Sequence, residues 1–180
     1  MLFRSVYGYD TNLNEYYFND CNTGSRGFEV EYKLKLERFY TALNYSYYEP
    51  LQSNKVEHSV YSIPGIKNQS LAFPSNKLNF SSNVAFSRIV NFTFSESYLS
   101  RRYSATTNDI GIKTVTQYHP VFYSNASLNF DNVFAKGVVF RLSCLNIFDE
   151  KVYYIQPYKG NHEPLPGAGR EIQVHLSYSF

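Results

Sequence analysis

Tryptophan is absent from the 180 residues, and cysteine occurs only twice. The two cysteines, Cys21 and Cys144, lie far apart, and neither has a second cysteine at the short spacing of a metal site or redox motif. A disulfide would require the two to be neighbours in space. The simpler interpretation is a pair of unpaired thiols, one in a loop and one packed in a strand.

The sequence also lacks any run of about 18 apolar residues, the length that a transmembrane helix needs. This absence excludes a helical membrane protein but not a transmembrane β-barrel, because barrel strands alternate apolar and polar residues and average to ordinary hydropathy. The opening residues, MLFRSVYGYD, have neither the apolar core nor the cleavage site of a signal peptide. We therefore expect any export signal to lie outside this chain.

Neither sign of charge dominates, because the sequence has 17 Lys and Arg and 15 Asp and Glu, for a net charge of +2. Without a basic block the protein is not expected to bind nucleic acid. The nucleophile motif G-x-S-x-G is missing. The glycine-rich string GAGR leads into a predicted strand instead of the helix that a phosphate-binding loop requires. We expect no catalytic residue, no cofactor and no metal site, and therefore no enzyme.

What the sequence does contain is aromatic residues, 18 Tyr and 15 Phe, set in an almost unbroken alternation of apolar and polar positions. In FEVEYKLKLE the apolar positions are Phe28, Val30, Tyr32, Leu34 and Leu36. In the last eleven residues, REIQVHLSYSF, they are Ile172, Val174, Leu176, Tyr178 and Phe180. A period of two indicates strands with one apolar and one polar face.

The alternation predicts an all-β fold whose strands form one antiparallel meander, curved but not closed. The eight predicted strands cover residues 2–9, 15–37, 39–49, 75–87, 89–103, 118–130, 137–148 and 169–180. The second would carry a bulge near CNTGSRG. Tight turns, near residues 36–40, 87–90 and 131–136, alternate with long connections at 50–74, 104–117 and 149–167.

A β-sandwich is the commoner fold with this alternation, but three features favour a membrane barrel. Most predicted strands have ten or more residues, about the length that spans a bilayer when tilted, whereas ordinary strands average about five or six. Short turns alternate with long loops, as in outer-membrane barrels. Tyr and Phe gather at strand ends, where they would form aromatic girdles at the membrane boundary. The apolar face would meet lipid and the charged face a hydrated lumen.

Two stretches near the C-terminus carry a family resemblance. CLNIFDEKVYY, followed by PLPGAGREIQVHLSYSF, resembles the end of TonB-dependent outer-membrane receptors, with Asn146 to Asp149 matching one element and Pro166, Gly167, Gly169 and Arg170 the other. The stretch GFEVE, from Gly27 to Glu31, resembles another strand of that family. The resemblance implies that residues 1–180 are the C-terminal segment of a receptor barrel, 22-stranded when complete, with the plug domain absent from this chain.

The resemblance further implies a receptor in the bacterial outer membrane for energy-coupled uptake of a scarce nutrient: an iron chelate, cobalamin or a glycan. Its partners would be outer-membrane lipid, the remainder of the barrel and plug, the TonB complex through the missing N-terminal part, and the barrel-assembly machinery. Tyr178 and Phe180, in the terminal strand, would form the signal that this machinery reads.

Candidate ligand contacts are sparse. Arg101, Arg102 and Tyr103 end the fifth predicted strand at the loop side, where they would bind an anionic chelate or meet lipid headgroups. His58 and His162 lie in long loops and would either touch a ligand or remain solvated. A different class of protein also fits: a complete, small eight-stranded barrel with a structural or adhesion role, in which the charged residues from Glu29 to Glu37 would have to pair inside a packed lumen.

Overall fold

The structure is a computed structural model that describes residues 2–9, 11, 14–51, 62–63, 65–157 and 162–180. Every regular element in these residues is a β-strand, so the all-β prediction is confirmed. Among the described residues no helix is long and apolar enough to cross a membrane.

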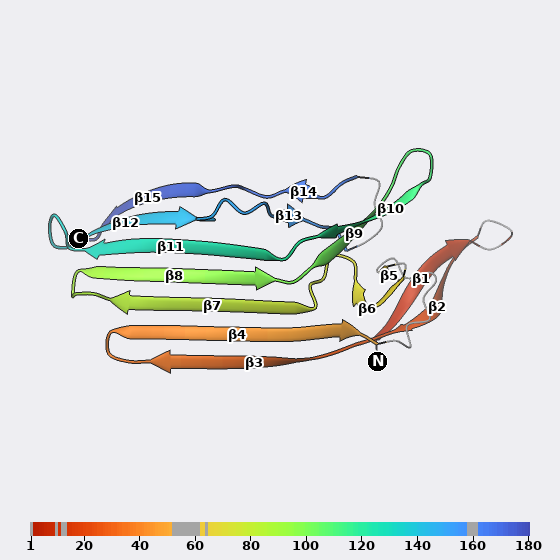
Figure 1. Ribbon diagram of the computed structural model, residues 1–180, viewed down its shortest axis with the longest axis horizontal. Coiled ribbons are helices and arrows are strands. Elements are labelled where there is room, and N and C mark those ends of the chain that lie inside the picture. The colour runs from red at the N-terminus through yellow and green to blue at the C-terminus, as the bar shows by residue number, and fades with distance from the viewer. Residues whose placement is uncertain (1, 10, 12–13, 52–61, 64, 158–161) are drawn as a thin grey trace.

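Seven strands form one antiparallel sheet in sequence order, from β3 at one edge to β15 at the other (Figure 1). They are β3 (Ser25–Lys35), β4 (Phe39–Pro50), β7 (Asn76–Ala85), β8 (Val90–Leu99), β11 (Val121–Asp131), β12 (Val138–Leu145) and β15 (Glu171–Tyr178). Within the described residues neither edge pairs with another strand, so the sheet is open. The predicted meander is confirmed, whereas a closed eight-stranded barrel is not what the sheet forms.

The remaining strands are four small hairpins. They are β1 (Leu2–Tyr9) with β2 (Glu15–Thr23), β5 (Ser62–Ile63) with β6 (Ile66–Ser70), β9 (Arg102–Thr107) with β10 (Lys113–Tyr118), and β13 (Tyr153–Tyr154) with β14 (Leu165–Pro166). Figure 1 shows them at one end of the large sheet, whereas the tight turns and the C-terminus lie at the other end. The predicted alternation of short turns and long connections is therefore confirmed.

Two predicted strand boundaries are wrong, and so is the predicted place of the first strand, so that the large sheet has seven strands and not eight. The segment 15–37 is not one bulged strand but two, β2 and β3, which belong to different sheets and are separated by Gly24. Residues 2–9 pair with β2 instead of joining the large sheet. The segment 89–103 ends at Leu99, and the supposed loop 104–117 is mostly the β9–β10 hairpin. Alternation continues through a change of pairing partner, so it cannot locate the point where one sheet ends and another begins.

The register aligns the apolar positions of all seven strands on one face. Leu142 lies opposite Leu128 on one side and Val174 on the other. The same row of pairing continues through Phe92 in β8 and Val84 in β7 to Phe39 in β4, and Leu34 of the edge strand lies opposite Thr41, two residues further along β4 on the same face. Side chains directly opposite each other in a sheet point to the same face. The predicted shared face of Val30, Leu34, Phe140, Leu142, Val174 and Leu176 is confirmed.

None of the described residues forms a second layer over this apolar face. Val174 is 65% exposed, Phe28 55% and Leu142 41%. The buried hydrophobic cluster described by the structure, Ile63, Leu71 and Ala105, belongs to the hairpins at the loop end instead of the sheet. Glu96 and Ser124 interrupt the apolar face; they lie opposite each other, and the Ser124 hydroxyl donates to the Glu96 carboxylate. A β-sandwich is thereby ruled out for the large sheet.

Gly27 shows why the GFEVE stretch begins with glycine. A Cβ at this position would lie 2.1 Å from the backbone oxygen of Tyr47 on the neighbouring strand. We expect Gly27→Ala to force β3 away from β4 and to lower the stability of the folded protein by about 1–3 kcal/mol. The measurement is the temperature at which the folded band disappears on heat-modifiable gels of membrane fractions. Gly24→Ala, whose Cβ would meet the flexible end of Leu51 at 2.8 Å, is the matched control; equal losses for the two variants would contradict the explanation.

Candidate functional site

The three predicted strand-end residues have separate surroundings at the loop end of the sheet. Arg101 is exposed, and its backbone carbonyl accepts a hydrogen bond from the Gln69 amide. Arg102, in contrast, is buried, with 7% of its surface exposed. Tyr103 packs against the Ile63–Leu71–Ala105 cluster, and its hydroxyl donates to the Gln117 side chain over 3.1 Å. The adjacent arginines therefore have different surroundings, which the sequence did not predict.

Arg102 is anchored by one hydrogen bond. Its Nη1 donates to the Tyr153 carbonyl over 3.1 Å, whereas Nε and Nη2 are buried and have no partner among the described residues. Burial lowers the pKa of the Arg102 guanidinium below its usual range, but arginine remains protonated in proteins. The Arg102 guanidinium is therefore a positive charge in a fixed position, and two of its three nitrogens form no hydrogen bond with the described residues.

A cavity of about 240 Å³ adjoins Arg102. It is formed where β9, β10 and the start of β11 meet the segment that follows β12. Its lining residues are Arg102, Gln117, Tyr118, His119, Pro120, Val121, Glu150, Lys151 and Tyr153. The rings of Tyr118 and Tyr153 pack with centroids 5.1 Å apart. The sequence did not indicate this site, because its walls come from two separate connections of the large sheet, β8 to β11 and β12 to β15, and no local motif marks them.

Of the predicted loop contacts, only His162 is among the described residues. His58 lies outside the described residues. His162 is exposed, and its Nδ1 is 3.0 Å from the carbonyl oxygen of Glu163; it does not line the cavity beside Arg102. Tyr178 and Phe180 are exposed at the opposite end of the sheet, with ring centroids 6.2 Å apart. Their role as an assembly signal stays a prediction, as does ligand contact by the arginines and histidines.

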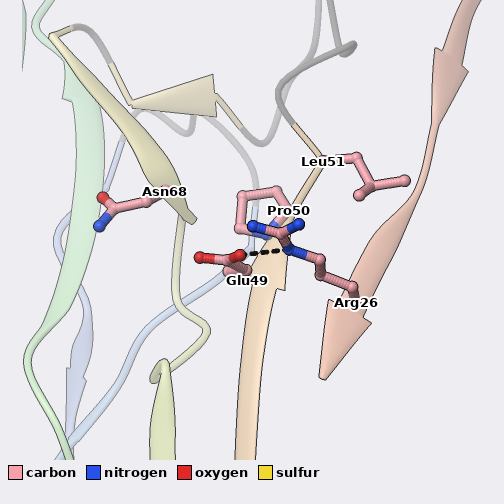
Figure 2. A pocket seen from close by; sticks show the side chains of 5 residues that line it. All are labelled: Arg26, Glu49, Pro50, Leu51 and Asn68. Atoms are coloured by element: carbon pink, nitrogen blue, oxygen red, sulfur yellow. Dashed lines mark hydrogen bonds and ion pairs between the residues drawn. The ribbon is translucent and has the colours of Figure 1, made fainter. Parts of the chain in front are cut away.

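Another cavity, of about 220 Å³, lies where β3 begins and β4 ends. Figure 2 shows Arg26 reaching across to Glu49, with Asn68 contributed by β6. The Glu49 carboxylate also accepts a hydrogen bond of 2.8 Å from the Tyr47 hydroxyl. Arg26 and Glu49 already pair with each other, so the described residues that line this cavity offer no unused charge to a ligand.

The two stretches that carried the family resemblance contact each other. Asn146 is fully buried, with φ of 50°. Its side-chain amide donates to the carbonyls of Glu150 and Ala168, at 2.9 and 3.4 Å, and its Oδ1 accepts from the Glu150 amide at 2.8 Å. Asp149 Oδ1 accepts from the Arg170 backbone amide at 2.8 Å. The Asn-Ile-Phe-Asp turn therefore holds the chain where it re-enters the last strand.

The polar face of the sheet is joined by side-chain hydrogen bonds between strands. Asn79 accepts from Ser97 at 3.0 Å, and Asn83 donates to Thr93 at 2.8 Å. The further links are Asn91 to Asp131 at 3.1 Å, Asn125 to Ser95 at 3.3 Å and Arg141 to Asn129. These bonds connect four strands, β7, β8, β11 and β12, along a hydrophilic surface.

The described part of the chain contains neither a disulfide nor a metal site. Cys144 is a free thiol on the apolar face of β12, as the simpler interpretation predicted; the side chain of Cys21 lies outside the description. No group of three or more His, Cys, Asp or Glu among the described residues could hold a metal ion.

No protein-family model matches the chain, and no curated protein matches its sequence. Solved structures, however, share its fold. FpvA of Pseudomonas aeruginosa, bound to heterologous pyoverdines, matches with a TM-score of 0.76 at 12% identity, over 99% of this chain and 23% of that one. The ferric-catecholate import receptor Fiu of E. coli K12 matches with a TM-score of 0.70 at 13% identity, over 97% of this chain and 23% of that one. The iron transporter FrpB of Neisseria meningitidis matches with a TM-score of 0.66 at 13% identity, over 97% of this chain and 27% of that one.

These structures are TonB-dependent outer-membrane receptors. The chain spans about a quarter of their length, and it has the fold of a section of their barrel. The predicted resemblance is thus confirmed at the level of the fold, and the complete eight-stranded barrel is not favoured.

Proposed function

We propose, from the fold that this chain shares with TonB-dependent outer-membrane receptors, that it forms the C-terminal part of such a receptor's barrel wall. The protein would sit in the bacterial outer membrane and take up a scarce nutrient. One observation carries the proposal: the apolar face of the large sheet runs through seven strands without a second layer of described residues over it, and neither edge pairs with another strand among the described residues.

The apolar face argues for lipid as its environment. Monomeric soluble proteins rarely expose contiguous apolar patches larger than a few hundred Å², whereas this face runs through every strand of the sheet. A strand of about ten residues, tilted as in a barrel, crosses the hydrocarbon core of a bilayer. Lipid contact would therefore replace the second sheet that a soluble protein requires.

The open edges argue for further strands. In a membrane every backbone amide and carbonyl must be paired, so only a closed barrel is stable there. β3 and β15 would accordingly pair with the remainder of the receptor barrel. The polar face would line the lumen and face a plug domain, through which the TonB complex would supply energy. The barrel-assembly machinery would read the terminal strand at Tyr178 and Phe180.

An iron chelate is the nutrient class that the similar structures favour. They include receptors named for ferric catecholates and for iron, and one bound to pyoverdines. Cobalamin or a glycan would use the same architecture with different loops. We expect transport and not catalysis, because the polar surfaces described above hold no arranged nucleophile and base.

The test is uptake by the bacterium that carries the gene. Deleting the gene should reduce uptake of a radiolabelled ferric chelate under iron limitation, and an epitope-tagged copy should fractionate with the outer membrane in a heat-modifiable form. If the tagged protein is found in the soluble fraction, the barrel assignment is wrong. If it is in the outer membrane and uptake of iron chelates, cobalamin and glycans is unchanged, the transport assignment is wrong.

A further inference from the structure

Arg26 is the only basic residue that the seven described strands of the large sheet place on their apolar face. It precedes Phe28 by two positions in β3, so both side chains lie on that face. Its partner across the strands is Glu49, next to the last residue of β4, just as Phe28 lies opposite Tyr47. An ion pair therefore stands at the loop end of a face that is otherwise apolar over these two strands.

A group of aromatic rings lies directly below this ion pair. The ring of Phe28 packs against Tyr45 and Tyr47, with centroids 5.8 and 5.7 Å apart. The Tyr47 hydroxyl donates to the Glu49 carboxylate over 2.8 Å, so its ring is on the apolar side and its hydroxyl on the polar side. Tyrosines placed in this way mark the boundary between acyl chains and headgroups in membrane proteins. Arg26 and Glu49 would accordingly lie at the level of the lipid headgroups.

The ion pair uses only part of the hydrogen-bonding capacity of its two members. Nε of Arg26 donates to one Glu49 oxygen, whereas no described residue accepts a hydrogen bond from Nη1 or Nη2. The Arg26 side chain is 74% exposed, so these two nitrogens can be reached from outside. Figure 2 shows the other Glu49 oxygen directed away from Arg26, and each carboxylate oxygen can accept more than one hydrogen bond. The pair thus has no net charge, but it has unused donors on one member and unused acceptor capacity on the other.

We propose that this end of the apolar face binds the zwitterionic headgroup of a membrane phospholipid. The phosphate accepts hydrogen bonds from Nη1 and Nη2 of Arg26, and the ammonium group donates to the Glu49 carboxylate. A headgroup with one charge of each sign matches a pair with one charge of each sign, so neither protein charge has to leave its partner. The inference rests on the proposed function, because it requires the apolar face to meet lipid, and it adds a position and a class of lipid.

The cavity beside the pair has the size and lining of a headgroup site. Its volume of about 220 Å³ has room for several waters, each of which takes about 30 Å³, and hence for a phosphoethanolamine group. Arg26, Glu49 and Asn68 supply its polar lining, and Pro50 and Leu51 its apolar lining. The acyl chains of the same lipid would lie outside the cavity, along the apolar face below it.

The experiment measures lipid binding by the intact receptor, purified in detergent from the outer membrane and stripped of lipid. Native mass spectrometry compares the binding of phosphatidylethanolamine with that of phosphatidylglycerol, which has the phosphate but no ammonium group. The wild type should bind phosphatidylethanolamine several-fold more tightly. Arg26→Gln should weaken that binding several-fold, and Glu49→Gln should remove the preference between the two lipids.

The matched control is an ion pair of the same strand on the opposite face. Lys33 and Glu31 are 2.8 Å apart and both are 55% exposed, so Lys33→Gln removes an equally accessible charge from the polar face. It should leave lipid binding unchanged. An equal loss in Lys33→Gln, or an unchanged preference in Arg26→Gln, would overturn the proposal.

Phosphatidylcholine provides a test on the wild type alone, which stays informative if a variant does not fold. Its trimethylammonium group has no N–H to donate to Glu49, so it should bind several-fold more weakly than phosphatidylethanolamine. Equal binding of all three lipids would overturn the headgroup site. A protein found in the outer membrane without such a preference would still retain the lipid-facing wall, whereas recovery of the tagged protein in the soluble fraction would remove both proposals.

Discussion

Leu142→Arg is expected to destabilise the folded protein by about 2–4 kcal/mol, the cost of placing arginine near the middle of a membrane strand, if the apolar face meets lipid as proposed. Leu142 lies in β12 with strands on both sides, opposite Leu128 and Val174. Its side chain is 41% exposed on the apolar face. The neighbouring strands hold the backbone in place, so only the arginine side chain could bend toward the membrane surface to bring its charge out of lipid.

The control is the next residue. Ser143→Arg introduces the same side chain on the opposite face, where Arg141 already lies beside Asn129. We expect it to change stability by less than about 1 kcal/mol. Both variants are compared by the temperature at which the folded band is lost on heat-modifiable gels. Similar losses for the two, or a larger loss for Ser143→Arg, would show that the assignment of the faces is wrong.

Asn146→Ala should be the other strongly destabilising change. The substitution removes three side-chain hydrogen bonds at a fully buried position. At about 1 kcal/mol for each bond, together with the strain of alanine at a positive φ, the expected loss is about 3–4 kcal/mol. The last strand would lose its attachment, since Asn146 holds the Ala168 carbonyl just before β15.

Asn132→Ala serves as the matched control for this change. Asn132 also has a positive φ, of 57°, but it is exposed and its side chain accepts one hydrogen bond, from the Gly137 amide at 2.8 Å. The loss there should be about 1–2 kcal/mol. Comparable melting temperatures for the two variants would mean that the buried hydrogen bonds of Asn146 contribute little.

The large sheet could be predicted because its signal is local. Alternation identifies each strand and its apolar face, and short turns specify antiparallel neighbours. Hence the face shared by Val30, Phe140 and Leu176 followed directly from counting residues in pairs. Where the chain changes sheets without a break in the alternation, as at Gly24 and after Leu99, the sequence contained no corresponding signal.

The site could be predicted only in part. The sequence placed Arg101 and Arg102 at the loop end, but it treated them alike. Their difference arises from tertiary packing: the segment around Tyr153 covers Arg102 and leaves Arg101 exposed. Likewise, the sequence identified the motif around Asn146 by its residue types alone. The motif forms hydrogen bonds to a segment about twenty residues later, and only the structure shows them.

The central claim, that one face of the sheet meets lipid and the other water, is tested most directly on β11, which pairs with strands on both sides. Spin labels are attached to single cysteines at each position from Asn125 to Phe130, with Cys21 and Cys144 replaced by serine, in the protein reconstituted into lipid vesicles. Power saturation then compares access by oxygen with access by a water-soluble nickel chelate. The account predicts a strict period of two, with positions 126, 128 and 130 open to oxygen and positions 125, 127 and 129 open to nickel. Equal access by the nickel chelate at all six positions would contradict it.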